Sequence, residues 1–308
     1  MVYFNQQLSQ TSAMEYSIED WIAAAPVDRV TFRQTVHIIL QAIASSDYLQ
    51  PRMIMKGGML MGLRYQSSRF TEDIDFSTSL RYADIDEAKF REELTESLQI
   101  ASDELPYQVL CAVQSITIQP KDVENATFPS FKLKIGYARR NNEGEMNRLR
   151  NGQSPNTVKI DYSFNEHSFE MDHISLTNEE ELQAYSFTDL VAEKIRSVIQ
   201  QVERNRSRRQ DIYDLNLLMD IVTPDKKECY TILTTLLDKS AERLPAGTVN
   251  PETLGLPEIR ERSSREYARL RDEIEGDLPD FDRAYDRLET FYRSLPWSQV
   301  SGWQNAQD

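Results

Sequence analysis

Two aspartates separated by one residue, Asp73 and Asp75, form the sharpest chemical signal in this 308-residue sequence. They stand in Asp73-Ile74-Asp75-Phe76, where polar and apolar residues alternate as in a β-strand. Residues i and i+2 of a strand project to the same side, so the two carboxylates would repel each other unless a cation lay between them. Mg²⁺ prefers oxygen ligands, so the pair predicts a magnesium site. The alternative is a solvated strand edge.

A third carboxylate, Asp161, stands in the alternating stretch 158–164, where it shares one face with Lys159 and Ser163. If this strand neighbours the one that carries the aspartate pair, three carboxylates could hold two metal ions. Such sites activate an attacking hydroxyl and stabilise the leaving oxygen in phosphoryl-type transfer. The alternative for Asp161 is a polar residue on a half-exposed strand.

A glycine pair lies upstream of these acids, in Lys56-Gly57-Gly58. It follows the short apolar run Met53-Ile54-Met55 and precedes a helical pattern over 59–65, which is typical of a buried strand that meets a tight turn. Such a turn brings backbone N–H groups close to a phosphate, and the N-terminus of the following helix favours an anion. The alternative is a tight connection without a ligand.

These features resemble a known pattern. The stretch from Lys56-Gly57-Gly58 to Arg69-Phe70-Thr71-Glu72-Asp73-Ile74-Asp75-Phe76 is similar to the opening motif of the nucleotidyltransferase superfamily, and more narrowly of the AbiEii/AbiGii toxin family. Lys194 and Asp211-Ile212-Tyr213-Asp214-Leu215 extend the resemblance to about residues 51–220. The superfamily's turn often has Ser after Gly. This chain has Gly58, which leaves the phosphate contact to backbone N–H groups.

The resemblance implies an enzyme that moves a nucleoside monophosphate from an NTP to an acceptor hydroxyl and releases pyrophosphate. The residues that it implies for catalysis are Asp73, Asp75, Asp161, Lys194 and Asp211, with Mg²⁺ held by the first three. The residues that it implies for NTP binding are Lys56, Gly57, Gly58, Arg69 and Lys194. For Lys194 the alternative is a side chain that extends to solvent from an apolar stripe, and for Asp211 it is a helix cap.

The same resemblance implies the toxin of a toxin–antitoxin pair that acts in abortive infection on RNA such as tRNA, with a cognate antitoxin as partner. Two alternatives remain open. One is nucleotidylation of a protein or a small molecule. The other is a nucleotide- or partner-binding module without turnover, against which the intact acid trio counts.

The charge distribution bears on an RNA substrate. Lys plus Arg number 35 and Asp plus Glu number 50, a net charge of −15, which argues against a general nucleic-acid coat. RNA contact would therefore be local, and the cluster Arg204, Arg206, Arg208 and Arg209 predicts such a patch. A looser cluster, Arg139, Arg140, Arg148 and Arg150, could form a second clamp. The alternative for each cluster is a solvated loop.

The periodicity of the chain indicates the elements that must position these residues. We expect helices over 30–43 and 85–105, strands over 53–55, 73–76, 107–119, 131–137 and 158–164, and a long hairpin loop over 139–156. After residue 180 we expect helices over 187–202, 211–221, 228–237, 259–274 and 281–295, and no strand. This predicts an α+β fold with a mixed sheet flanked by helices. Residues 1–180 would form the nucleotidyltransferase domain, and residues 181–308 a helical domain that closes the active site.

Composition limits the remaining classes. No apolar run approaches the ~20 residues of a membrane helix, and Met1-Val2-Tyr3-Phe4-Asn5-Gln6-Gln7 lacks the basic and apolar regions of a signal peptide. The two cysteines, Cys111 and Cys229, cannot build a disulfide scaffold, so a reducing cytoplasm fits best. The three histidines lack the partners of a zinc site.

Overall fold

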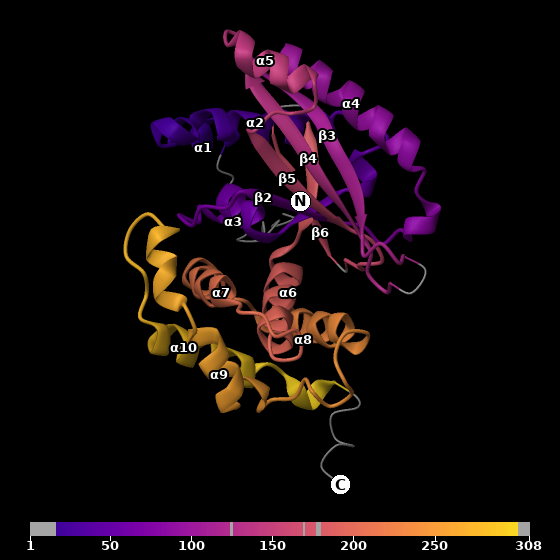
Figure 1. Ribbon diagram of the computed structural model, residues 1–308. Helices are drawn as coiled ribbons and strands as arrows, with labels where there is room; N and C mark the ends of the chain where they lie inside the picture. The colour runs from indigo at the N-terminus through magenta and orange to yellow at the C-terminus, as the bar shows by residue number, and fades with distance from the viewer. Residues whose placement is uncertain (1–16, 124–125, 169, 177–179, 301–308) are drawn as a thin grey trace, which may run out of the picture.

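The computed structural model describes residues 17–300 apart from 124–125, 169 and 177–179 (Figure 1). The expectation about residues 1–7 lies outside this range. The helices are α1 (Ile18–Ala23), α2 (Val30–Ala44), α3 (Gly57–Tyr65), α4 (Glu87–Glu104), α5 (Glu143–Arg150), α6 (Phe187–Gln200), α7 (Arg209–Ile221), α8 (Lys226–Ala241), α9 (Pro257–Ser264) and α10 (Phe281–Ser294). The strands are β1 (Ile54–Lys56), β2 (Asp73–Ser77), β3 (Val109–Gln119), β4 (Ser130–Arg139), β5 (Thr157–Ser163), β6 (Met171–Ser175) and β7 (Glu181–Tyr185).

The strands form a seven-stranded sheet in the order β3-β4-β5-β2-β1-β7-β6. β2 runs parallel to β5 and antiparallel to β1, and β7 runs parallel to β1. The sheet is therefore mixed, and the expected α+β class is confirmed. Figure 1 shows the sheet in the upper part of the molecule and α6–α10 below it.

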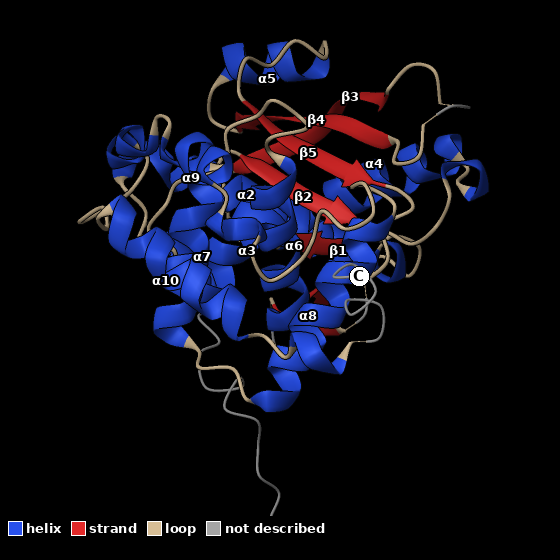
Figure 2. Cartoon of the chain, turned by 90° about the horizontal axis from the view of Figure 1, so that it is seen from below, coloured by secondary structure: helices blue, strands red, loops and turns tan. Residues whose placement is uncertain are grey.

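One face of the sheet is apolar and covered by helices. Ile74 and Phe76 of β2 and Ile160 and Tyr162 of β5 are buried on this face. Phe90 of α4 stacks on Tyr162, with ring centroids 5.6 Å apart and an interplanar angle of 15°. Because side chains alternate along a strand, the polar residues between these positions point to the opposite face. In Figure 2, seen from below, β3, β4 and β5 lie in the upper part of the view and α7, α8 and α10 in the lower part.

Helix α6 lies at the centre of the helical part and is buried almost all round. Its apolar positions include Leu190, Ile195 and Val198, and it packs against α7 and α8. Ser186 caps the helix, because its hydroxyl accepts a hydrogen bond from Asp189 N at 3.2 Å. No helix in the described part of the chain is long and apolar enough to cross a membrane.

The structure corrects the expectation of no strand after residue 180. β7 begins at Glu181 and pairs with β1, where Ala184 lies opposite Met55. Leu182 and Ala184 are buried while Glu181 is exposed, so the alternating pattern exists. It covers five residues and runs directly into a helix, which makes it a weak signal. The neighbouring strand β6 was also missed.

Two further expectations were wrong. The stretch 139–156 is not only loop, because it contains α5, which Asn142 caps by accepting a hydrogen bond from Glu145 N at 3.1 Å. The expected helix over 259–274 is broken into α9 and a 3-10 segment over Tyr267–Asp272. The break falls at Glu266, whose backbone is left-handed, with φ 62°.

The chain segment just before β2 is held by the helical part. Phe70 N donates a hydrogen bond to Glu273 O at 2.7 Å, and Glu275 N donates to Ser68 O at 3.2 Å. The hydroxyls of Ser68 and Tyr213 lie 3.0 Å apart. The position of the Asp73–Asp75 strand therefore depends on contacts with residues about two hundred positions later in the sequence.

Candidate active site

A row of charged residues crosses four neighbouring strands on the polar face of the sheet. Asp75 of β2 pairs in register with Asp161 of β5 on one side and with Lys56 of β1 on the other. Lys132 of β4 pairs in register with Asp161. Residues that face each other across neighbouring strands project to the same side, so the order of charges along the row is lysine, aspartate, aspartate, lysine. The expected neighbourhood of Asp75 and Asp161 is present.

The two central carboxylates of the row are in different environments. Burial raises the pKa of Asp75 to about 6, Lys56 opposes that shift, and Asp161 and Asp73 add to it. Asp161 Oδ2 forms an ion pair with Lys132 Nζ, whereas Asp161 Oδ1 is buried and has no hydrogen-bond partner among the described residues. Two adjacent carboxylates, one of them with an unused oxygen, provide ligands for a cation.

Asp73 lies at the edge of this arrangement. It precedes Asp75 by two residues, projects to the same side and is exposed. Lys159, in register with it on β5, places its Nζ 3.9 Å from Asp73 Oδ1. In the described residues no group of three or more His, Cys, Asp or Glu side chains is gathered closely enough to hold a metal ion. The predicted metal ligands are therefore neighbours, of which Asp73 and Asp161 pair with lysines and Asp75 lies in register with Lys56.

The glycine turn lies directly beside the carboxylates. Helix α3 begins at Gly57, whose φ of 75° is a conformation that side-chain-bearing residues rarely adopt. A Cβ at Gly57 would overlap Asp75 Oδ2 and lie 2.8 Å from Asp75 Cγ. A Cβ at Gly58 would lie 2.9 Å from Arg69 Nη2. Gly57 must therefore be glycine for the helix N-terminus to approach the acids this closely, and a side chain at Gly58 would displace the guanidinium of Arg69.

Lys56 points into an ion-pair chain at one end of the row. Its ammonium group pairs with Glu166, whose other carboxylate oxygen accepts from Arg243 at 2.7 Å. Burial acts to lower the pKa of Lys56, but the Glu166 carboxylate outweighs it and raises that pKa above its ordinary value. Lys56 is thus a charged residue held by protein partners beside the cleft.

A buried carboxylate that sequence reasoning missed, Asp214 of α7, joins two of the predicted residues. It is fully buried and accepts a two-pronged hydrogen bond from Arg69, at 3.1 and 2.9 Å. Lys194 Nζ donates to it at 2.6 Å and lies 3.3 Å from Asp211 Oδ1. Burial acts to raise the pKa of Asp214, but Lys194 and Arg69 outweigh it and lower that pKa. The signal available was its place three residues after Asp211, on the same helical face.

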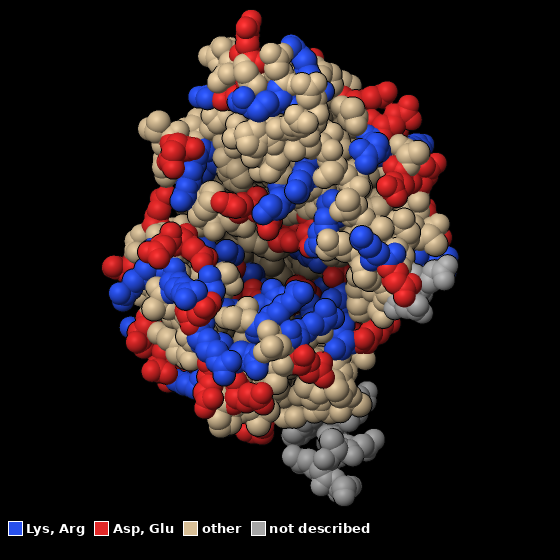
Figure 3. All heavy atoms as spheres, viewed as in Figure 1, with Lys and Arg blue, Asp and Glu red and all other residues tan. Residues whose placement is uncertain are grey.

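All the predicted catalytic and NTP-binding residues line one cleft of about 840 Å³ between the sheet and the helical part. The cleft residues that had been predicted are Lys56, Gly57, Gly58, Arg69, Asp73, Asp75, Asp161, Lys194 and Asp211. Figure 3 shows this hollow, with acidic side chains at its centre and basic side chains along its margins. The structure thus brings together residues from 56 to 211.

Three of the four predicted RNA-binding arginines also line the cleft, namely Arg204, Arg206 and Arg208. None of the three has an ion-pair partner in the part of the chain that the structure describes. Burial lowers the pKa of Arg204, and the positive charges of Arg243 and Arg206 add to the effect. These arginines therefore gather positive charge that the protein itself does not neutralise.

The other arginines are placed differently. Arg209 does not line the cleft, because its guanidinium pairs with Glu266 at 3.1 Å and with Glu273 at 2.8 Å. The looser cluster at Arg139, Arg140, Arg148 and Arg150 lies on the end of β4 and on α5, outside the cleft. Arg140 pairs there with Asp103 at 2.5 Å.

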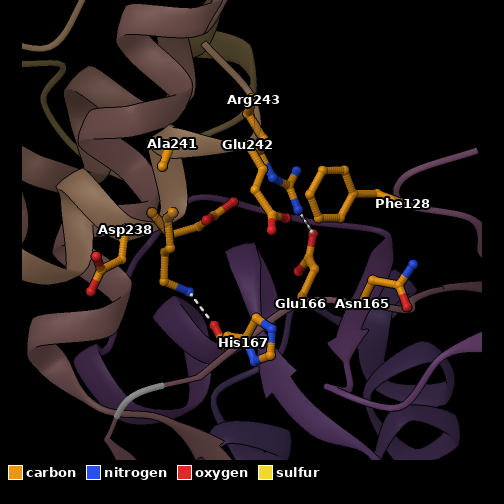
Figure 4. Close-up of a pocket in the computed structure, with 10 residues that line it drawn as sticks. Phe128, Asn165, Glu166, His167, Asp238, Ala241, Glu242 and Arg243 are labelled. Atoms are coloured by element: carbon orange, nitrogen blue, oxygen red, sulfur yellow. Dashed lines mark hydrogen bonds and ion pairs between the residues drawn. The ribbon is translucent and has the colours of Figure 1, made fainter. Parts of the chain in front are cut away.

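A smaller pocket of about 180 Å³ adjoins the cleft at the Lys56 end (Figure 4). Figure 4 shows the Arg243 guanidinium over the ring of Phe128, at 3.6 Å from the centroid, with its hydrogen bond to Glu166. Lys239 donates to His167 O at 3.2 Å on the opposite side. The cations that line this pocket are therefore engaged by the protein.

Comparison with known proteins assigns the chain to a family. The model of the "Nucleotidyl transferase AbiEii toxin, Type IV TA system" family matches residues 38–287. The chain belongs to the AbiEii nucleotidyl transferase toxin family. The match contains the glycine turn, the three aspartates, Lys194 and Asp211, so the expected resemblance is confirmed. No curated protein matches the sequence closely enough to count as a relative.

A solved structure shares the fold of this AbiEii family member. The crystal structure of JHP933 from Helicobacter pylori is 15% identical and has a TM-score of 0.50, with 92% of this chain and 99% of that chain covered. A second H. pylori structure, provisionally described as a nucleotidyltransferase, is 14% identical and has a TM-score of 0.48, with 88% of this chain and 96% of that chain covered.

Proposed function

We propose that this AbiEii family protein transfers a nucleoside monophosphate from an NTP to a hydroxyl group of an RNA. The acceptor oxygen forms a bond to the α-phosphorus, the bond from that phosphorus to the bridging oxygen breaks, and pyrophosphate leaves. The observation that carries the proposal is the in-register pair Asp75 and Asp161 in a cleft whose lining includes arginines without an ion-pair partner among the described residues.

The carboxylates fit a divalent cation such as Mg²⁺. Asp161 Oδ1 is buried without a hydrogen-bond partner among the described residues, and burial raises the pKa of Asp75, with the charges of Asp161 and Asp73 adding to the effect. Both are hard oxygen ligands, with Asp73 as the third predicted one. When bound, Mg²⁺ would polarise the phosphoryl oxygens and lower the pKa of the attacking hydroxyl.

The triphosphate would bind at the glycine turn. The first N–H groups of an α-helix have no partner within the helix, and the first two residues of α3, Gly57 and Gly58, line the cleft beside Asp75. Lys194 lies in the same cleft and remains charged, because Asp214 and Asp211 raise its pKa against the opposing effect of burial. Catalysis would rest on positioning and charge neutralisation rather than on a covalent intermediate.

Asp161 would complete the cation site and in that way help to activate the acceptor hydroxyl. Its Oδ1 has no partner among the described residues and is the available ligand atom, whereas Oδ2 is held by Lys132. Asp211 would hold Lys194 in place. The helical part would form the second wall of the cleft, since Lys194 is on α6 and Asp211 on α7, and residues 181–308 would close over the bound substrates.

RNA is the acceptor that the arginines support. Arg204, Arg206 and Arg208 leave positive charge free in a protein of net charge −15, and phosphate groups are the partners that arginine binds best. The family implies a cognate antitoxin, and we propose one as the partner of this protein. Free Cys111 and Cys229 support a reducing, cytoplasmic setting.

The test is a transfer assay with each α-³²P-labelled NTP, Mg²⁺ and total cellular RNA, using the wild type and Asp75→Asn. We expect label in a discrete RNA band with the wild type and none with the variant. Label in protein or in a small molecule, but not in RNA, would overturn the RNA acceptor. Absence of any labelled product would overturn the transferase proposal for this protein.

A matched pair of variants tests the arginines. Arg206→Ala/Arg208→Ala removes two cleft arginines, and Arg148→Ala/Arg150→Ala removes two exposed arginines on α5, away from the cleft. We expect RNA labelling to fall about tenfold or more with the first pair at physiological salt and to stay unchanged with the second. Equal effects of the two pairs would contradict a specific role for the cleft arginines.

A further inference from the structure

The polar face of the sheet continues beyond the carboxylates across β5, β4 and β3. Its residues lie in three rows of paired positions: Ser115, Lys134, Lys159 and Asp73 in the first; Thr117, Lys132, Asp161 and Asp75 in the second; Gln119, Ser130, Ser163 and Ser77 in the third. Every one of these side chains is polar. A face with this composition is built to meet water or a polar ligand rather than the protein interior.

Part of this face is open to solvent. Thr117, Gln119, Lys134 and Lys159 are exposed. The helices α2 and α4 lie against β3, and Phe90 of α4 packs on the apolar side of the sheet. Helix α5 covers β4 farther along, where Met146 and Leu149 cluster with Ala138. The surface therefore leads from solvent to the acids without an obstruction from these helices.

Three lysines, Lys132, Lys134 and Lys159, lie on this face beside the aspartates, and we call them the lysine face. Lys132 pairs with Asp161, and Lys159 Nζ lies 3.9 Å from Asp73 Oδ1. Lys134 and Lys159 occupy paired positions on neighbouring strands, whose backbones lie about 5 Å apart. Lys132 is two residues from Lys134 and projects to the same side. Lys134 has no ion-pair partner among the described residues. Of the lysine face, Lys132 lines the cleft and the other two lysines lie farther out on the same face. Arg204, Arg206 and Arg208 border the cleft from the helical side, and Figure 3 shows basic side chains along its margins.

We infer that the lysine face binds the sugar–phosphate backbone of the acceptor RNA and directs the reacting hydroxyl toward Asp161. The inference rests on the proposed function, because it takes RNA as the acceptor. The rows hold no aromatic side chain, so there is no platform on which bases stack, and the contacts go to phosphate and sugar. Binding at this face is consequently independent of base sequence.

The position of the face distinguishes its ligand from the NTP. The glycine turn lies on the β1 side of Asp75, whereas the lysine face lies on the β5–β4–β3 side. The triphosphate site thus lies near the Lys56 end of the charged row, and the lysine face lies at the Lys132 end. The two substrates approach the carboxylates from opposite ends.

The experiment measures binding directly, by fluorescence anisotropy of a labelled single-stranded RNA of mixed sequence and by calorimetric titration of ATP. The test variant is Lys134→Gln/Lys159→Gln, which leaves Lys132 and the carboxylates in place. The control variant, Lys226→Gln/Lys227→Gln, removes two exposed lysines at the start of α8. Each variant changes the net charge by the same amount, and all four positions are exposed.

We expect the test variant to bind RNA about tenfold more weakly, and the slope of log K against log[salt] to fall by about 1.4, because a single-strand contact contributes about 0.7. The test variant should bind ATP as tightly as the wild type does. The control variant should match the wild type in both RNA and ATP affinity. Unchanged RNA affinity would overturn the inference and leave an acidic protein as the ligand of this face. Weakened ATP binding would overturn it in favour of a triphosphate site. Failure of the wild type to bind RNA would overturn the RNA acceptor itself, a distinct result.

Discussion

Asp75 and Asp161 are eighty-six positions apart in the sequence, yet they occupy paired positions on the adjacent parallel strands β2 and β5. The pairing places two carboxylates side by side on the polar face, beside the glycine turn at Gly57. Like charges this close cost free energy in the folded state unless a cation or a proton neutralises one of them. The repulsion between the two carboxylates can therefore be measured through the free energy of unfolding as well as through activity.

Asp75→Asn should abolish nucleotide transfer and stabilise the fold. The raised pKa, about 6 against an ordinary 3.8, means that the folded protein binds this proton more tightly than the unfolded chain. The wild type therefore loses stability from this group as the pH rises from about 4 to 6, and the variant does not. Urea unfolding at pH 7 without divalent cations should show a gain of about 1–3 kcal/mol, and at pH 3.5 little difference.

Asp73→Asn is the matched control for that measurement, since Asp73 is an exposed carboxylate of the same strand. Its unfolding free energy should stay close to that of the wild type at both pH values. A stability gain at Asp73 equal to that at Asp75 would contradict a cost specific to the burial of Asp75.

Mg²⁺ should raise the melting temperature of the wild type. A ligand that binds only the folded state at a hundred times its dissociation constant adds about 2.7 kcal/mol, and EDTA should reverse the effect. Asp75→Asn and Asp161→Asn should each lose most of this response, because each removes a carboxylate of the pair. An undiminished thermal shift in both variants would place the cation elsewhere.

Gly57→Ala should disable the site through a direct collision. The added Cβ would overlap the Asp75 carboxylate, and φ at this position is 75°. Gly247→Ala provides the control, because φ there is 80° but nothing lies within 4 Å of the added Cβ. Both variants should lose about 1 kcal/mol or more to backbone strain in thermal unfolding, and only Gly57→Ala should lose transfer. Comparable transfer rates in the two variants would show that the close approach is unimportant.

Asp214→Asn should destabilise the protein strongly, because it leaves the buried cations Lys194 and Arg69 without their shared counter-charge. The expected loss is about 3–5 kcal/mol in urea unfolding. Asp220 lies on the same helix as Asp214 and forms an exposed ion pair with Arg287 of α10. Asp220→Asn removes this pair and should change stability little. A double-mutant cycle between Asp214→Asn and Lys194→Met should show coupling above about 1 kcal/mol, and additive effects would argue against a working pair.

The local sequence pattern predicted most of the helices and strands and most residues of the candidate site. The helices that flank the sheet and the strands that carry Asp75 and Asp161 lie close to their expected ranges, because alternation and helical periodicity are properties of neighbouring residues. Because these patterns record only neighbouring residues, they fail for short or mostly polar elements that tertiary contacts stabilise. β7 is short and leads directly into a helix, and α5 is a mostly polar helix whose Met146 and Leu149 pack on Ala138.

The sequence by itself determined that Asp73 and Asp75 share one side of a strand and that a glycine turn precedes them, because these features depend only on residues near each other in the chain. Tertiary structure decided the rest. The register of β2 against β5, the burial of Asp214 between Arg69 and Lys194, and the pairing of Arg209 away from the cleft join segments that lie far apart in sequence. Such pairings follow from how distant elements pack and neutralise buried charge, which no local pattern records.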